Sequence, residues 1–163
     1  MASLNEMVRW AVGTYWTRRD IHTEYALSDG MPDIYNPPHR KNLGIGLINI
    51  VCEINDYDDG DRRRVKTYIE KDEQILELAT NGSTLPQCLI DKLNARYEAG
   101  ASEANSPQYY GSKIAGHYLS KVGGSVTIEN FVDENKGYSV RTVVRLPLDY
   151  AKKSNTLEHA PDF

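Results

Sequence analysis

The stretch YYGSKIAGHYLSKVGGSVTIEN, residues 109–130, decides how this chain is expected to fold. Apolar residues recur at helical spacing from Ile114 to Val122, and Gly123-Gly124 then interrupts the pattern. Val126 and Ile128 alternate with polar residues, as in a strand with one buried face. The stretch therefore predicts a helix, a glycine turn and a strand, a unit that packs in many folds and carries no function by itself.

The composition predicts one globular domain. The chain has 163 residues, of which 40% are apolar and 26% charged, and no apolar run approaches the roughly 18 residues of a membrane span. The first residues lack the basic and apolar regions of a secretory signal, so we expect a cytoplasmic protein. The net charge of −4 gives no footprint for nucleic acid, and we interpret Arg62-Arg63-Arg64, which lies among aspartates, as a solvated loop end.

The segments before residue 58 predict two helices and a strand. Residues 4–16 place their apolar side chains on one helical face that nothing in the same segment covers, so we expect this face to contact a partner or a second copy of the chain. Residues 21–27 alternate with the period of a strand, and a proline-rich loop covers residues 28–38. Apolar residues cover much of the helix expected over residues 39–57, which indicates deep burial.

The remaining segments complete a sheet. Residues 65–71 and 75–79 predict a hairpin, residues 87–98 a short helix, residues 99–107 a mobile loop and residues 139–148 a last strand. Together the elements predict an α/β (α+β) two-layer sandwich, in which a mixed sheet of about five strands carries three helices on one face. The domain plan is an N-terminal helix or linker over 1–19, one domain over 20–148 and a flexible tail over 149–163.

In this order and spacing the chain resembles the ATP-binding domain of sensor histidine kinases, in the GHKL superfamily that also includes gyrase and MutL. LINIVCEINDY (47–57) resembles the asparagine box, and LATNGSTLP (78–86) resembles the first glycine box. The opening stretch resembles the second glycine box and its helix, and YSVRTVVRLPL (138–148) resembles the closing strand. The resemblance implies a Bergerat-like fold that binds Mg-ATP or Mg-ADP.

The residues that the family uses for nucleotide are largely replaced in this chain. Glu53 stands where the family has a magnesium-binding asparagine, with Asn49 one helical turn earlier. A carboxylate is also a magnesium ligand, but it adds negative charge beside a triphosphate. Thr80 stands where an aspartate accepts a hydrogen bond from adenine, whereas the next two residues, Asn81 and Gly82, are retained.

The second glycine box departs furthest from the family pattern. Counting back from Gly123-Gly124 places Pro107 to Ser112 where small residues normally let the backbone close over the phosphates. Gly111 survives, and Lys113 is a candidate cation for a phosphate. With these substitutions we expect no tightly bound nucleotide.

Three hypotheses about function follow. The first is a degenerate kinase domain, a pseudokinase, that works by protein contact in two-component or phosphorelay signalling, with a response regulator or a kinase helical hairpin as its partner. The second is an active catalytic domain that transfers phosphate to a histidine on a separate domain, using Glu53 for Mg²⁺. The third is a phosphotransferase that uses His117, the histidine of the second-box helix.

Overall fold

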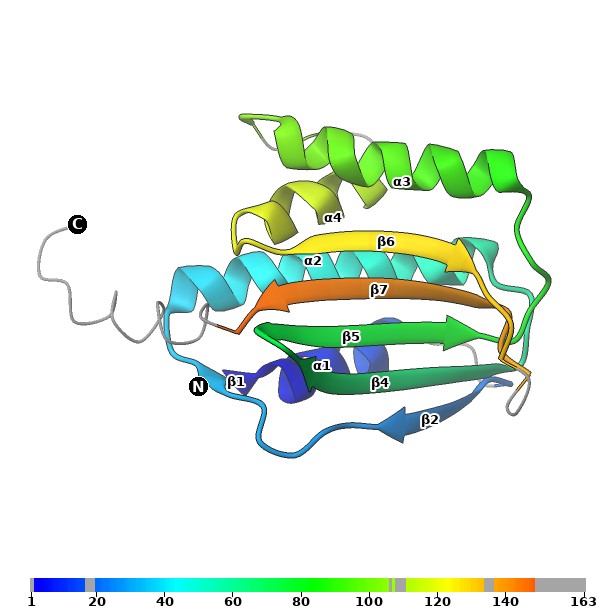
Figure 1. Ribbon diagram of the computed structural model, residues 1–163, viewed down its shortest axis with the longest axis horizontal. Helices are drawn as coiled ribbons and strands as arrows, with labels where there is room; N and C mark the ends of the chain where they lie inside the picture. The colour runs from blue at the N-terminus through cyan, green and yellow to red at the C-terminus, as the bar shows by residue number, and fades with distance from the viewer. Residues whose placement is uncertain (1, 17–19, 106, 108–110, 134–136, 149–163) are drawn as a thin grey trace, which may run out of the picture.

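The computed structural model describes residues 2–16, 20–105, 107, 111–133 and 137–148. A five-stranded sheet forms one layer, and helices cover one of its faces (Figure 1). The strand order is β2-β4-β5-β7-β6, which confirms the predicted two-layer sandwich with a mixed sheet. Within the described residues, no helix is both long and apolar enough to cross a membrane.

The sheet is antiparallel except at one edge. Its strands are β2 (His22–Ala26), β4 (Arg62–Glu70), β5 (Glu73–Thr80), β6 (Ser125–Asn130) and β7 (Val140–Pro147). Strand β2 pairs with β4 in parallel, whereas β4-β5, β5-β7 and β6-β7 are antiparallel. Two short strands, β1 (Ala2–Ser3) and β3 (Asp33–Ile34), form a separate antiparallel pair.

Four helices lie on one side of the sheet: α1 (Leu4–Tyr15), α2 (Pro37–Tyr57), α3 (Gln87–Ser102) and α4 (Gly111–Ser120). Ser3 and Glu6 form a capping box at the start of α1, and Asn36 caps α2 directly before two prolines. Helix α2 crosses behind the sheet, and α3 and α4 lie side by side next to β6 (Figure 1).

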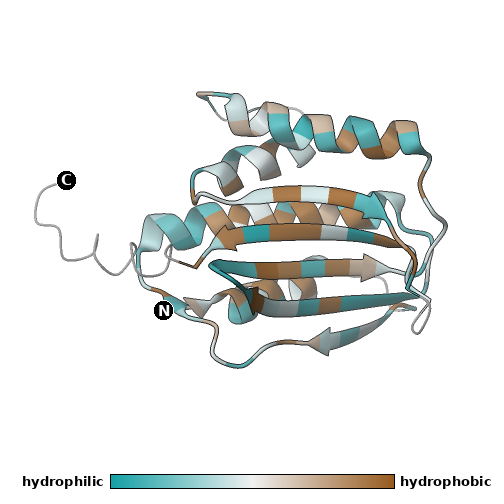
Figure 2. Cartoon of the chain, in the orientation of Figure 1, coloured by the Kyte–Doolittle hydropathy of each residue, from teal (hydrophilic) through white to brown (hydrophobic). Residues whose placement is uncertain are grey.

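The core lies between the sheet and the helices. Hydrophobic and polar residues alternate along the strands (Figure 2), and the hydrophobic residues on the inner side pack against α2 and α4. Helix α1 belongs to the same core, because Leu4, Val8, Ala11 and Val12 are buried there. The sheet is thus covered by one helix more than the sequence predicts.

The apolar face of α1 was expected to contact a partner or a second copy through residues 4–16, and the structure corrects this expectation. The face packs in its own chain, with α2 as its main neighbour. It is therefore covered, and it supplies no argument for an oligomer. The predicted boundary of a separate segment over 1–19 stays a prediction, and residues 149–163 lie outside the described part of the chain.

Two local predictions were wrong. Helix α3 continues through Ser102, so the first residues of the loop expected over 99–107 are helical. The arginine run is no solvated loop end, because strand β4 begins at Arg62 and the side chain of Arg63 is 0% exposed. Strand alternation turns Arg63 inward together with Val65 and Thr67.

Candidate functional site

The structure brings together three of the predicted site residues where α2 meets the start of α4. Asn49 and Glu53 lie one turn apart on α2. A methyl group placed on Gly111 would lie 3.3 Å from Glu53 Oε2 and 3.7 Å from Asn49 Oδ1. Two side-chain oxygens therefore lie beside the first turn of α4, where backbone N–H groups have no partner within the helix.

Lys113 lies in the same turn of α4 and is paired. Its Nζ lies 3.1 Å from Glu103 Oε1, directly after the end of α3. The pair is partly exposed and adds little stability, about 0–1 kcal/mol for pairs of this kind. The predicted phosphate-binding cation therefore connects two helices, and a phosphate would have to compete with Glu103 for it.

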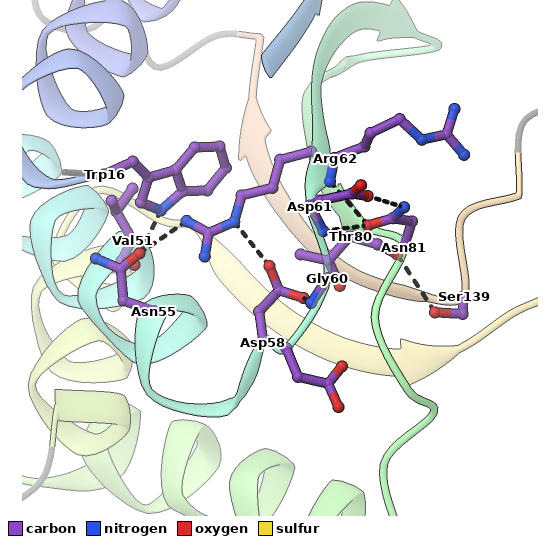
Figure 3. A network of polar contacts seen from close by, with 12 residues as sticks. Trp16, Val51, Asn55, Asp58, Gly60, Asp61, Arg62, Thr80, Asn81 and Ser139 are labelled. Carbon is purple, nitrogen blue, oxygen red and sulfur yellow. Dashed lines mark hydrogen bonds and ion pairs between the residues drawn. The ribbon is translucent and has the colours of Figure 1, made fainter. Parts of the chain in front are cut away.

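Asn81 joins two loops (Figure 3), and Gly82 packs between them. Asn81 Oδ1 accepts hydrogen bonds from the backbone N–H groups of Asp61 and Arg62, at 3.0 and 2.8 Å. A side chain on Gly82 would overlap the carboxylates of Asp58 and Asp59, and one on Gly60 would overlap Asn81. The two residues retained from the first glycine box thus have structural partners of their own.

Thr80 is the last residue of β5, its side chain is 1% exposed, and its hydroxyl has no hydrogen-bond partner among the described residues. The hydroxyls of Tyr57 and Thr142 are also buried, and they interact with each other. Burial raises the pKa of Tyr57 well above its ordinary value, so the phenol stays protonated. A buried hydroxyl without a partner, such as that of Thr80, is uncommon in native proteins.

Solved structures share the overall fold of this chain. The Mycobacterial sensor histidine kinase MprB matches with a TM-score of 0.67 and 17% identity, over 90% of this chain and 96% of that one. The catalytic domain of histidine kinase ThkA gives 0.63 and 16% over 90% and 94%, and the ATP binding domain of PrrB from Mycobacterium tuberculosis gives 0.61 and 15% over 90% and 94%. This is the histidine kinase ATP-binding fold. No protein-family model and no curated protein sequence matches the chain.

The predicted boxes lie on three different parts of the fold. The asparagine-box segment forms the second half of α2, the first glycine box begins in the last three residues of β5 and continues after it, and the second precedes and begins α4. Glu53 and Gly111, which belong to different boxes, are neighbours. Pro107 apart, the other second-box residues before Gly111 lie outside the described residues.

A buried arginine network lies next to these boxes, and the sequence did not predict it (Figure 3). Arg63 Nε lies 2.8 Å from Asp58 Oδ2, and both side chains are 0% exposed. Arg63 also donates to Asn55 Oδ1 at 2.7 Å and stacks on Trp16, with Cζ 4.6 Å from the ring. The strand period that places Arg63 on the same face as Val65 is the signal that could have revealed it.

The same network attaches α1 to the histidine kinase fold. Trp16 Nε1 donates to the carbonyl of Val51 at 3.0 Å, and Asn55 Nδ2 donates to the carbonyl of Tyr15 at 2.7 Å. Both bonds join the end of α1 to α2, close to the arginine. The N-terminal helix is therefore fixed to the helix that carries Asn49 and Glu53.

His117 does not have the exposure that a phosphorylation site needs. Its side chain is 2% exposed, and both ring nitrogens are buried with no hydrogen-bond partner among the described residues. The ring packs edge-on against Tyr118, with centroids 5.1 Å apart. A phosphotransferase role for His117 would require α4 to move away from the core.

The pH dependence of stability is expected to report on Glu53. Burial, and secondarily Asp56, raise the pKa of Glu53 above its ordinary value of 4.5, and Arg96 opposes the shift. The ionised form is thus less favourable in the folded chain than in the unfolded chain. As pH rises from about 4.5, the pKa in the unfolded chain, through the raised pKa in the folded chain, ionisation of Glu53 lowers the free energy of unfolding. The loss is complete once the pH is above both pKa values.

Glu53→Gln should remove that loss, so its stability advantage over the wild type should grow from acidic to neutral pH. Urea denaturation at several pH values measures the difference. Glu98→Gln, which replaces an exposed carboxylate on α3, is the control and should run parallel to the wild type. If the free energy of unfolding of Glu53→Gln changed with pH in parallel with that of the wild type, the raised pKa of Glu53 would be contradicted.

Proposed function

We propose that this domain keeps the histidine kinase ATP-binding scaffold, binds nucleotide weakly or not at all, and acts by protein contact in two-component or phosphorelay signalling. The proposed partner is a response regulator or a kinase helical hairpin, and the proposed location is the cytoplasm. Whether the domain is an enzyme is decided by the experiments below.

The position of Glu53 carries this proposal. Its Oε2 lies 3.3 Å from the Cβ position of Gly111, beside the start of the helix that would meet the phosphates in the resembling kinases. The free N–H groups of that turn favour an anion, and the carboxylate is already there. A triphosphate would therefore meet a like charge, which favours loss of nucleotide affinity.

The surrounding contacts support the same conclusion. Lys113 is paired with Glu103, and Asn81 uses its amide to bond Asp61 and Arg62. Each of these polar groups already has a partner within the chain. Nucleotide binding would have to replace these contacts with better ones.

Calorimetric titration with Mg-ATP and Mg-ADP tests the proposal. We expect no binding in the micromolar range for the wild type. Glu53→Asn removes the charge and should improve nucleotide affinity by about tenfold or more, as expected when a repulsion of about 1.4 kcal/mol is relieved. Glu98→Asn controls for the lost charge and should change nothing. Micromolar affinity of the wild type would overturn the proposal.

The alternative is an active catalytic domain, and one observation favours it. Glu53 Oε2 and Asn49 Oδ1 both lie near the start of α4, and oxygen atoms of this type suit Mg²⁺. Magnesium is usually held by one or two protein oxygens together with substrate phosphates, so the residues present fit the ion. Bound there, the ion would neutralise phosphate charge, while Glu53 and Asn49 held it.

Phosphoryl transfer to a supplied histidine hairpin separates the two proposals. An active domain should label the hairpin from ATP, and Glu53→Ala should abolish the label. Absence of transfer from a folded wild-type chain would reject the alternative. Transfer that is unchanged in Glu53→Ala would reject the role of Glu53.

A further inference from the structure

The face of the sheet that carries no helix has a chemistry of its own. Because Arg63, Val65 and Thr67 point to the helices, Arg64 and Lys66 point to the opposite side. Strand pairing places Lys66 opposite Glu77 and Arg141 opposite Ala79, so three strands contribute to this face. It lies on the other side of the sheet from the nucleotide boxes.

Charged side chains cover the apolar residues of this face. Ile75 and Ala79 are fully buried, and Val143 nearly so, although their side chains point away from the helices. The long stems of neighbouring arginines and lysines can shield such residues while their charged ends stay in water. The face thus consists of apolar side chains next to the sheet, covered by the charged ends of longer side chains.

Aromatic rings hold several of these cations in place. Tyr138 has Arg64 Cζ 4.8 Å and Arg62 Cζ 5.5 Å from its ring centroid. Arg141 Cζ lies 4.7 Å from the Phe131 ring. Cation–π contacts of this geometry are favourable and limit the movement of both partners. The aromatic rings therefore hold these arginine side chains in defined positions over the sheet.

The charged side chains of this face surround a hollow of about 480 Å³. Its cations are Arg64, Lys66 and Arg141, and its carboxylates are Glu77 and Asp133. Phe131 and Val132 form an apolar wall, and Val132 is 83% exposed. The hollow is wide and shallow, so it would cover one side of a small ligand.

Two of the three cations around the hollow are paired with carboxylates. Arg64 lies 3.1 Å from Asp133, and Arg141 pairs with both Glu77, at 3.0 Å, and Glu129, at 2.5 Å. Lys66 has no ion pair in the described part of the chain, and its ammonium lies 5.3 Å from the Tyr68 ring centroid. Among the described residues, Lys66 is therefore the lining cation that no carboxylate pairs with, and it lies next to an exposed apolar wall.

We propose that this hollow binds a monoanionic ligand in which a carboxylate is joined to an aromatic ring. The carboxylate pairs with Lys66, and the ring lies against Phe131 and Val132. A single charge matches the one cation that is not paired, whereas a dianion would bring more charge than the site neutralises. The acid has two sources: a free small molecule, or a Glu or Asp beside an aromatic residue of a protein. The inference does not depend on the proposed function.

The test is an NMR titration of the labelled, full-length chain with N-acetylphenylalanine and with its uncharged amide. We expect the acid to shift backbone amides of β4, β5 and β7 around Lys66, Glu77 and Arg141. The acid should bind at least about fivefold more tightly than the amide, the ratio expected for one charge-assisted contact. The capped peptide acetyl-Glu-Phe-amide forms a second arm. Tighter binding of the peptide indicates a protein source, and tighter binding of the free acid indicates a small molecule.

Two lysine variants separate the site from general attraction to positive charge. Lys66→Met keeps the stem and removes the charge, so the preference for acid over amide should disappear. Lys121→Met is the matched control, because Lys121 Nζ lies 5.2 Å from the Tyr118 ring centroid in the helix layer. It should leave the preference unchanged. Phe131→Ala should weaken acid and amide alike, by removing the apolar wall.

Three results would overturn the proposal. The first is equal binding of acid and amide by the wild type. The second is a preference that survives Lys66→Met in a chain whose spectrum shows the native fold. The third is the absence of localised shifts with both the acid and the peptide up to about 50 mM, because a ligand of this size that fits its site should bind more tightly than that.

Discussion

Asp58→Ala is expected to lower the free energy of unfolding by about 3–5 kcal/mol, the cost of leaving a buried charge without its partner. Arg63 and Asp58 are both 0% exposed and lie 2.8 Å apart. Asp58 Oδ1 also accepts the backbone N–H of Gly60 at 3.0 Å. The variant would thus remove the acceptor of two donors, and the buried charge of Arg63 would keep only its hydrogen bond to Asn55 and its contact with Trp16. Urea denaturation followed by circular dichroism measures the change.

The double variant Asp58→Ala, Arg63→Met should recover much of that loss, because an apolar side chain needs no counter-charge. Glu73→Ala is the surface control. Glu73 lies 3.6 Å from Arg145, and both side chains are nearly half exposed, so its removal should cost no more than about 1 kcal/mol. A loss at Asp58 as small as the loss at Glu73 would show that the Arg63 charge is solvated.

Gly100→Ala and Gly116→Ala are each expected to destabilise the chain by about 1–3 kcal/mol or more, the range for overpacking. A methyl group on Gly100 would overlap the carbonyl of Lys113 in α4, and one on Gly116 would overlap the carbonyl of Tyr97 in α3. In each case the obstacle is backbone, which cannot rotate away as a side chain can. Either alanine would therefore force α3 and α4 apart, which thermal and urea unfolding would detect.

Gly13→Ala is the matched control for these helical glycines. Gly13 lies in α1, and no atom from outside its own turn lies within 4 Å of a methyl group placed there. Alanine should stabilise the chain at this position by up to about 1 kcal/mol, through helix propensity alone. If all three alanines shifted stability in the same direction, the proposed close packing of α3 on α4 would be wrong.

The two glycine contacts also bear on the nucleotide site. Helix α3 ends and α4 begins on either side of the loop that follows Ser102, and Lys113 pairs with Glu103 across it. Close backbone packing fixes the start of α4 relative to α3, and with it the position of Gly111 beside Glu53. A variant that separates these helices should therefore alter the surroundings of Glu53 as well as the stability.

Much of the fold could be predicted from the sequence because its signals are local. Period-two alternation and glycine turns identified β6 and β7, and helical periodicity identified α2. The order of the boxes indicated the histidine kinase fold. The candidate site was also partly predictable, since Asn49, Glu53 and Gly111 were chosen from their box positions and lie together in space.

The rest of the site could not be predicted, because it depends on partners far apart in sequence. Lys113, the candidate cation for a phosphate, pairs with Glu103. Asn81, retained from the first glycine box, joins two loops. In both cases the residue type was compatible with the predicted role, and a neighbour from another element determined the contact.

The sequence by itself determined the order of helices and strands and the substitutions in the nucleotide boxes, because both can be recognised from residues that are close together in the chain. Only the tertiary structure decided which charges are buried and which faces are covered. The face of α1 is covered by α2, and Arg63 is buried with Asp58, since burial depends on what packs from elsewhere in the chain. The opening stretch follows the same division. Its period predicted α4 and β6, but the packing of α4 on α2 placed a carboxylate beside Gly111.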